Sequence, residues 1–226
     1  MPAQPFETDV IQTSAGEMGI SFLGHGSLMF TLEEKVIHID PFSRVADYAN
    51  LPKADLILIT HEHQDHLDAS ALEEIRTDNT TIVLTELCDQ QINGGIVMRN
   101  GDMSVIQGLT IEAIPAYNLI HTRESGDPFH PCGHGNGYVL TIGNTRIYIA
   151  GDSENTPEMM SLSNIDIAFL PMNLPYTMTP EMVADAAHAI KPSILYPYHF
   201  GSTDTSLLIG LLQDQSDTEV RIRNMA

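Results

Sequence analysis

The segment THEHQDHLD, residues 60–68, is the most informative part of this chain. It places four metal-binding side chains within six positions: His61, His63, Asp65 and His66. Imidazole and carboxylate groups are ligands that Zn²⁺, Fe²⁺ and Mn²⁺ accept. In extended backbone the side chains of His61 and His63 point to the same side, so one ion can bind both. Because the chain then turns, Asp65 and His66 can face a second ion, and the segment predicts a dinuclear metal site.

Regular structure is predicted on both sides of this segment. ADLILIT, residues 54–60, is a continuous apolar run with the length of a strand that is buried on both faces. Asp68 is a favourable N-cap for a helix whose apolar face contains Leu72 and Ile75. A buried strand followed at once by a helix fixes the ligands between them, which favours a metal site over a surface loop that happens to be rich in histidine.

Two further strand ends supply candidate ligands, since two ions need more ligands than one loop can give. YIAGDS places Asp152 at the end of one predicted strand, and YPYHFG places His199 at the end of another. Taken alone, each would more often be an ordinary polar residue at a strand end. Together with the first four residues, they match the need for a bridging carboxylate and a distal imidazole held on rigid elements.

The remainder of the chain alternates short strands with helices. TPEMVADAAHAIKP, residues 179–192, predicts a helix with Thr179 as N-cap and Pro192 as the stop. KVIHIDP followed by ADLILITHEH resembles RIYIAGDS followed by IDIAFLPMN, because in each a hairpin ends near an Asp and a buried strand comes next. We therefore expect two similar β-rich halves packed face to face with helices outside, in one domain of residues 1–226 that begins with an irregular leader at residues 1–18.

The composition argues against several classes of protein. No apolar run approaches the ~20 residues that a membrane helix needs, and no secretion signal is visible, so a cytoplasmic protein is expected. Two cysteines, Cys88 and Cys132, are too few for a disulfide framework. With 30 acidic residues against 10 Lys and Arg, the net charge of -20 repels polyanions, and long nucleic acid is not expected as a partner. The sequence leaves the oligomeric state open.

The motifs together resemble a known family. H-x-H-x-D-H after an apolar strand, then G-D, then a strand-terminal His is similar to the metallo-β-lactamase fold superfamily, from GHGS (residues 24–27) to YHFG (residues 198–201). The sequence most resembles its metal-dependent hydrolase branch, which includes ascorbate-phosphate lactonase-like and N-acyl-phosphatidylethanolamine phospholipase D-like proteins. The resemblance implies an α/β fold of four layers, an αββα sandwich of two packed sheets flanked by helices.

The resemblance also implies a division of the ligands between two divalent ions. By this resemblance, His61 and His63 bind the first metal. The second metal is bound by Asp65, His66 and His199. Asp152 bridges the two ions. Zn²⁺ is the expected metal, with Mn²⁺ or Fe²⁺ as alternatives.

The sequence departs from the family pattern at one ligand of the first metal. A third histidine is expected where Asn118 stands, and an amide is a poor zinc ligand beside imidazoles. The loop PFHPCGHGNGY, residues 128–138, offers His130, which neighbouring Phe129 and Pro131 hold in a rigid turn. We predict that His130 completes the site, ahead of the alternatives His121 and His134, in that order. Completion of the site by water instead is a further alternative.

Four residues are predicted to support the site or line its pocket. Asp40 ends a strand equivalent to the strand before Asp152, so we expect it to orient a ligand histidine. His25 lies at a tight glycine turn, where it either lines the mouth of the site or is a structural turn residue. Asn118 and Tyr198 adjoin ligand-bearing segments. Cys132 lacks the neighbours that a separate zinc knuckle would require.

The predicted function is metal-dependent hydrolysis. A metal-bridging hydroxide would attack an ester, lactone or phosphodiester bond of a small or lipid-derived substrate, with Asp65 and Asp152 as the catalytic carboxylates. No G-x-S-x-G motif offers a serine nucleophile instead. The alternatives are a metal-binding or sensing protein without turnover and a nuclease-type phosphodiesterase of the same fold.

Overall fold

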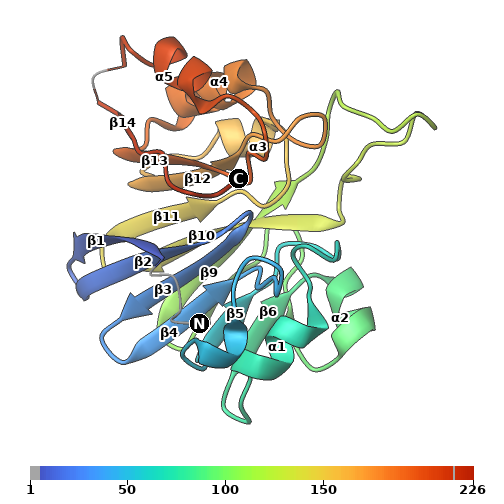
Figure 1. Ribbon diagram of the computed structural model, residues 1–226, viewed down its shortest axis with the longest axis vertical. Coiled ribbons are helices and arrows are strands. Elements are labelled where there is room, and N and C mark those ends of the chain that lie inside the picture. Colours follow the sequence, from blue (N-terminus) through green and yellow to red (C-terminus); the bar gives the residue numbers. More distant parts are fainter. Residues whose placement is uncertain (1–5, 216) are drawn as a thin grey trace.

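The computed structural model describes residues 6–215 and 217–226, and two β-sheets form its centre (Figure 1). Each sheet has seven strands within this part of the chain. The first sheet contains, in spatial order, β1 (Glu7–Thr13), β2 (Gly16–Gly24), β3 (Ser27–Leu32), β4 (Lys35–Ile39), β5 (Leu56–Leu58), β6 (Thr81–Leu84) and β7 (Ile96–Val97). The second contains β14 (Glu219–Val220), β13 (Ile194–Tyr198), β12 (Ile167–Pro171), β11 (Thr145–Ile149), β10 (Gly135–Ile142), β9 (Leu109–Ala116) and β8 (Met103–Ile106).

The two sheets have the same topology. In the first, β1 to β4 are antiparallel neighbours and β4 to β7 are parallel neighbours. In the second, β8 to β11 are antiparallel and β11 to β14 are parallel. The predicted similarity of the two halves therefore extends to every strand, and the halves divide the chain between β7 and β8.

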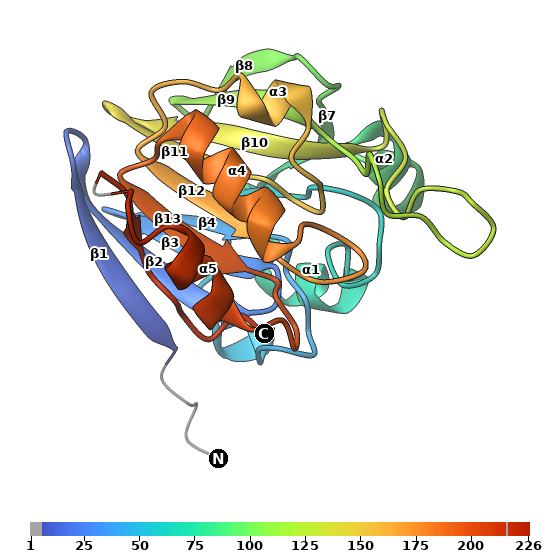
Figure 2. The ribbon, with the colours of Figure 1, turned by 90° about the horizontal axis from the view of Figure 1, so that it is seen from above.

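Helices cover the outer face of each sheet. The first sheet carries α1 (Ala69–Ile75) and α2 (Glu86–Ile92), with a short 3-10 helix at Tyr48–Asn50. The second sheet carries α3 (Pro157–Met160), α4 (Pro180–Ile190) and α5 (Thr205–Leu211), which Figure 2 shows lying across its outer face. The arrangement is the predicted four-layer αββα sandwich. No helix in the described ranges is long and apolar enough to cross a membrane.

Three apolar clusters hold the layers together, and they correspond to the three interfaces between layers. The cluster between the sheets includes Phe30, Tyr138 and Phe169, all fully buried. A second cluster joins α4 to the second sheet, and a third joins α1 and α2 to the first sheet. Strands buried on both faces explain the continuous apolar runs such as ADLILIT in the sequence.

The prediction of an irregular leader over residues 1–18 is wrong for its described part. Residues 1–5 lie outside the described ranges, but β1 and the start of β2 form a regular antiparallel hairpin. β1 is an edge strand, and Ile11 alone among its residues packs against the core between the sheets. Asp9 on this strand binds the guanidinium of Arg223 and the hydroxyl of Tyr196. Because polar contacts hold most of this strand, it lacks the apolar alternation that predicts a strand.

Candidate metal centre

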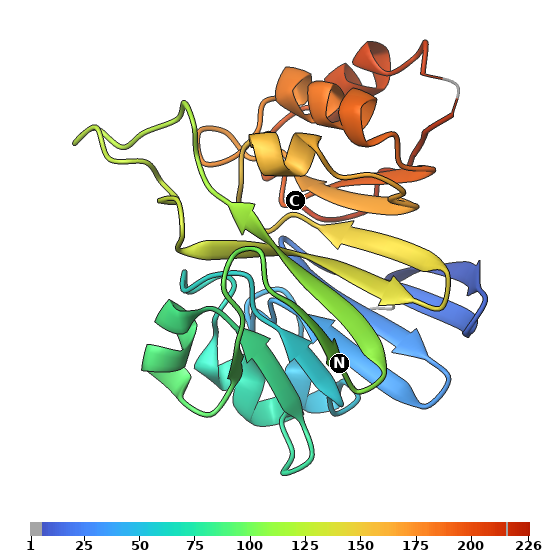
Figure 3. The same cartoon turned by 180° about the vertical axis from the view of Figure 1, so that it is seen from behind.

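The predicted ligands converge at one edge of the sandwich, where strands of both sheets end. His61 to His66 follow β5, Asp152 follows β11, and His199 follows β13 directly. The β9–β10 loop, which projects beyond the sheets in Figure 3, returns to this edge with His130. His25 and His199 both have positive φ angles, 54° and 46°, and non-glycine residues held in this region cluster at functional sites.

A first group of three imidazoles gathers His61, His63 and His130. Their nearest ring nitrogens lie within 4.8 Å of one another, and Nε2 of His61 lies 3.1 Å from Nδ1 of His63. His61 and His130 are buried, and His63 is half-buried. This set contains both residues expected at the first metal and the loop histidine expected to complete it.

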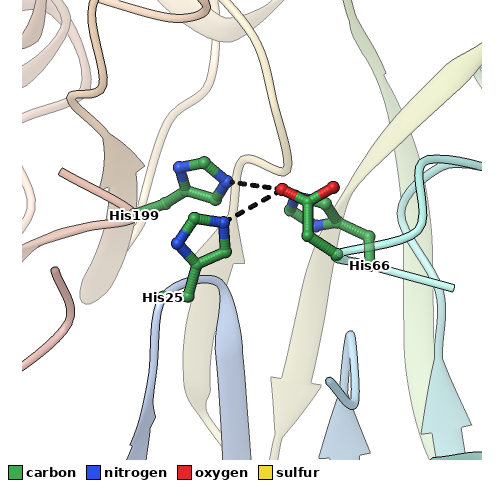
Figure 4. A group of neighbouring side chains, drawn as sticks. His25, His66 and His199 are labelled. Carbon is green, nitrogen blue, oxygen red and sulfur yellow. Dashed lines mark hydrogen bonds and ion pairs between the residues drawn. The ribbon is translucent and has the colours of Figure 1, made fainter. Parts of the chain in front are cut away.

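A second group gathers His66, His199, Asp65 and His25. Oδ2 of Asp65 lies 3.0 Å from Nε2 of His25 and 3.5 Å from Nε2 of His199. Figure 4 shows the His25 and His199 rings directed at the same carboxylate oxygen, with His66 beside it. The rings of His25 and His199 are close neighbours, with centroids 3.7 Å apart and planes tilted by 39°. His25 therefore lies inside this group and lines the cavity over it.

Asp152 lies between the two groups and directs one oxygen at each. Its Oδ1 is 3.5 Å from Nε2 of His66 and 3.6 Å from Nε2 of His199. Its Oδ2 is 3.3 Å from Nε2 of His130. This is the geometry of a carboxylate that can be shared by two cations.

Unpartnered buried atoms test whether these residues fit metal ions. Among the described residues, Nε2 of His66, Nε2 of His199 and Oδ1 of Asp152 are buried without a hydrogen-bond partner. Buried polar atoms are almost always paired, because leaving one unpaired is unfavourable. Three such atoms that converge at 3.5–3.6 Å are ligands of the type and number that a divalent ion accepts. The residues therefore fit a metal.

The Nδ1 atoms of His66, His61 and His199 also have partners, which supports the interpretation of these residues as metal ligands. Nδ1 of His66 donates to Oδ2 of Asp40 at 2.8 Å, as expected for a carboxylate that orients a ligand. Nδ1 of His61 lies 3.1 Å from Oγ1 of Thr60, and that hydroxyl donates to the same Asp40 oxygen at 2.6 Å. Nδ1 of His199 lies 3.3 Å from the Asn173 amide. Metal-binding imidazoles usually have their second nitrogen held in this way.

The electrostatics around Asp152 and His66 favour positive charge. Burial alone would raise the pKa of Asp152, but His199, His66 and His130 outweigh it and hold this pKa well below its usual value. Burial lowers the pKa of His66, yet Asp152 and Asp40 raise it to about 10. A buried imidazole with such a strong tendency to carry charge marks a position where a cation is stabilised.

The structure distinguishes the three histidines proposed to replace the missing ligand. His130 is 5% exposed and belongs to the first group. Nδ1 of His121 instead lies 2.6 Å from Oε1 of Glu154. The side chain of His134 is 45% exposed, lies 3.7 Å from Glu62 and belongs to neither group. Asn118 lies under His130, whose Nδ1 donates to Oδ1 of Asn118 at 2.8 Å.

Tyr198 supports the site from within the core. It is fully buried between the sheets, and its hydroxyl accepts a hydrogen bond from the backbone N–H of Gly151 at 2.9 Å. Gly151 has a positive φ of 64° and immediately precedes Asp152. Tyr198 thus fixes the backbone turn that presents Asp152 and does not line the open cavity.

An open cavity of about 490 Å³ lies over the two groups. Its volume is in the range of small-molecule sites, about 300–1,000 Å³. Away from the candidate metal ligands it is lined by Gln64, Arg123, Phe129, Asn173 and Tyr176. The Arg123 guanidinium lies 5.1 Å from the centre of the Phe129 ring and donates to the Phe129 carbonyl at 3.2 Å.

Sequence reasoning did not identify two residues that the structure brings to this region. Glu154 is fully buried beside the start of the β9–β10 loop, and its contacts span more than 30 residues, so no local spacing indicates it. Arg123 could have been noticed, because it is one of only 10 Lys and Arg residues and lies in the histidine-rich loop region.

Comparison with known proteins connects this geometry to a family. Residues 19–199 match the profile of the β-lactamase superfamily domain. A UPF0173 metal-dependent hydrolase of Symbiobacterium thermophilum is 30% identical over 217 residues, covering 91% of this chain and 92% of the relative. A UPF0173 metal-dependent hydrolase of Thermococcus kodakarensis is 30% identical, covering 81% of this chain and 84% of the relative.

Solved structures agree with these sequence matches. The crystal structure of a candidate metal-dependent hydrolase from Parabacteroides distasonis is 46% identical, with a TM-score of 0.93, and covers 98% of this chain and 100% of that chain. Igni18, a metallo hydrolase from Ignicoccus hospitalis, has a TM-score of 0.74 at 24% identity, covering 92% and 95% of the two chains, and this likeness concerns the fold alone.

Proposed function

Because this chain belongs to the β-lactamase superfamily, and within it to the UPF0173 metal-dependent hydrolases, we propose that it cleaves an ester, lactone or phosphodiester bond of a small or lipid-derived substrate. The observation that carries this proposal is Asp152, which directs one carboxylate oxygen at each of two ligand groups. Such a shared carboxylate suits a centre of two divalent ions, with Zn²⁺ as the expected metal and Mn²⁺ or Fe²⁺ as alternatives.

The ligand groups assign a role to each residue in this proposal. The first ion would be held by His61, His63 and His130. The second would be held by Asp65, His66 and His199, with Asp152 common to both. Bound ions would supply the Lewis acidity that activates water and stabilises negative charge on oxygen.

Of the two carboxylates at the cavity, that of Asp65 is the more accessible to substrate and to the attacking water. Its side chain is 35% exposed, whereas that of Asp152 is 5% exposed. Its Oδ2 contacts His25 and His199, which leaves Oδ1 to orient the water or accept its proton. His25 fixes the carboxylate from the cavity side.

The cavity favours a substrate that carries negative charge. Arg123 is the one Arg or Lys among the residues lining it, and no ion pair with a carboxylate is present for Arg123 within the described chain. The ring of Phe129 lies beside Tyr176, with centroids 5.0 Å apart, and offers an apolar wall next to the cation. A small anionic ester or phosphodiester fits these features, whereas the net charge of -20 disfavours long nucleic acid.

The test is hydrolysis by the metal-loaded protein. After loading with Zn²⁺, Mn²⁺ or Fe²⁺, the protein is assayed on lactones, carboxylic esters, thioesters and phosphodiesters, and we expect turnover of at least one ester, lactone or phosphodiester. His61→Ala should lower kcat/KM by at least about 100-fold, because it removes a ligand on which the centre depends.

His134→Ala is the matched control, since this exposed histidine of the same region lies outside both groups and its loss should leave kcat/KM within about twofold. Absence of turnover with every metal, or equal activity in His61→Ala and the unmodified protein, would contradict the proposal.

A further inference from the structure

Glu154 is a buried carboxylate that belongs to neither ligand group. It is fully buried, two residues after Asp152. Its Oε2 accepts hydrogen bonds from the backbone N–H groups of Leu119 and Ile120, both at 2.7 Å. Its Oε1 accepts from the backbone N–H of His121 at 2.8 Å. Three successive backbone donors thus fix this carboxylate at the start of the β9–β10 loop.

Glu154 and the carbonyl of Tyr176 together set the orientation of the Asn118 amide. Nδ2 of Asn118 donates to Oε1 of Glu154 at 3.1 Å and to the carbonyl of Tyr176 at 2.9 Å. Both partners are acceptors, so the hydrogen-bond network assigns the amide nitrogen to their side. Oδ1 of Asn118 must then face His130.

The Asn118 amide in turn determines which nitrogen of His130 carries the proton. Oδ1 of Asn118 accepts from the backbone N–H and from Nδ1 of His130, both at 2.8 Å. Nδ1 must therefore be protonated, which leaves Nε2 as the ring nitrogen that can present a lone pair to a metal ion. That nitrogen lies 3.3 Å from Oδ2 of Asp152. The N–H of Asn118 also donates to the carbonyl of His130 at 2.9 Å, which fixes the loop end at which His130 lies.

We propose that Glu154 is a positioning residue of the first metal site, acting through Asn118 on the tautomer and direction of His130. This inference rests on the proposed function, in which His130 shares the first ion with two other histidines. It explains the departure at Asn118, because the amide holds the histidine that takes the place of the expected one. A carboxylate that only closes the turn at residues 119–121 would not need to contact Asn118 at all.

Cobalt binding tests this proposal without reference to turnover. Co²⁺ is titrated into the metal-free protein and into Glu154→Gln, and the visible absorption bands give the stoichiometry and the affinity of each site. The unmodified protein should bind two ions per chain. Glu154→Gln places an amide N–H₂ against the donors of Asn118 and His121, so we expect first-site affinity to fall about 10–100-fold. Affinity at the site of Asp65, His66 and His199 should stay within about twofold.

Thr156→Val is the matched structural control on the same segment. Thr156 is fully buried and caps α3 by accepting from the N–H of Met159, and none of the hydrogen bonds of the Asn118 side chain within the described chain is to Thr156. Its loss should lower the melting temperature while both Co²⁺ affinities remain those of the unmodified protein. If Thr156→Val and Glu154→Gln weaken first-site binding equally, or Glu154→Gln binds both ions normally, Glu154 has only a structural role and the proposal is overturned.

Two further measurements separate positioning from folding. In ¹⁵N spectra of the Zn²⁺-loaded protein, His130 should show a protonated Nδ1, and Glu154→Gln should show a mixture of tautomers. Glu154→Asp keeps a carboxylate as the acceptor for the Asn118 amide, so this variant should bind the first ion several-fold more tightly than Glu154→Gln. Absence of both effects would overturn the proposal. A protein that binds two ions but hydrolyses nothing would contradict the proposed function and leave this inference standing.

Discussion

Three buried histidines of the metal centre have the ring nitrogen that faces away from the centre in a hydrogen bond with a neighbouring side chain. Asp40 holds His66, Thr60 holds His61 and Asn118 holds His130. Because one nitrogen is engaged in this way, the other can present its lone pair without a loss of side-chain freedom on binding. These hydrogen bonds orient the three rings within the centre.

Arg123 is the residue whose substitution should reveal the charge of the substrate. A hydrogen-bonded charge pair contributes about 1.5–3 kcal/mol, so Arg123→Gln should raise KM about 10-fold or more for an anionic ester. The matched substrates are 4-nitrophenyl hemisuccinate and 4-nitrophenyl butyrate, which have acyl chains of the same length and differ by one carboxylate. We expect KM to rise for the first and to remain unchanged for the second, with kcat largely preserved in both.

Arg99→Gln is the control for Arg123, because Arg99 is exposed and paired with Glu86 outside the cavity. An equal change for both substrates, or an equal change in Arg99→Gln, would show that Arg123 does not bind a substrate anion.

Local spacing accounts for the site residues that the sequence could predict. His61, His63, Asp65 and His66 lie in one short segment, and the rigidity of Phe129 and Pro131 correctly favoured His130 as the histidine brought to the first group. These assignments as ligands remain predictions until an ion is observed. Glu154 could not be predicted, because its role depends on contacts with a loop more than 30 residues away, which no local pattern records.

At the scale of elements, the capping residues in the sequence correctly predicted where the helices α1 and α4 begin. Asp68 accepts from the N–H of Ser70 at the start of α1, and Thr179 accepts from the N–H of Met182 at the start of α4. α4 ends at Ile190, and Lys191 follows in the left-handed conformation before Pro192. The helix α2 was not predicted, because its seven residues are polar except for Leu87, Cys88 and Ile92, and it is too short to show a clear apolar period.

The cap of α4 should contribute measurably to stability. Thr179→Ala leaves the first-turn N–H groups without a side-chain acceptor, so we expect the free energy of unfolding to fall by about 1 kcal/mol. For a chain of this size that is about 2–4 °C in the melting temperature. Thr179→Ser, which keeps the hydroxyl, should lose much less, and both variants should retain full metal binding. Urea denaturation gives the values, and equal stability of the Ala and Ser variants would show that the cap contributes nothing.

On the scale of the whole molecule, the metal centre is built by both halves of the repeated topology. His25 lies between β2 and β3, and His130 lies between the corresponding strands β9 and β10. Each therefore comes from the same place in its own half, and each belongs to a different ligand group. The sequence indicated this repeat only faintly, because the two halves are similar in how their strands pair and much less in which residues they contain.

Metal removal should therefore destabilise the entire fold. Ions that bind only the folded protein add about 4 kcal/mol when their free concentration is about 1,000 times Kd. Chelation should lower the melting temperature by roughly 10 °C, and added Zn²⁺ should restore it. In His61→Ala the response should be smaller, because one of the two sites is disrupted. A melting temperature that is indifferent to chelator and to added metal would contradict this prediction.

The single passage from one sheet to the other has a consequence for how the molecule can be assembled. Within the described residues the chain crosses once, through residues 98–102, where Arg99, Gly101 and Asp102 are exposed. A peptide break there would leave each sheet with all of its strands, yet neither fragment would possess a complete ligand group. We therefore expect two separately produced fragments to form complete ligand groups only when they associate. Metal binding would then report on the association of the two fragments.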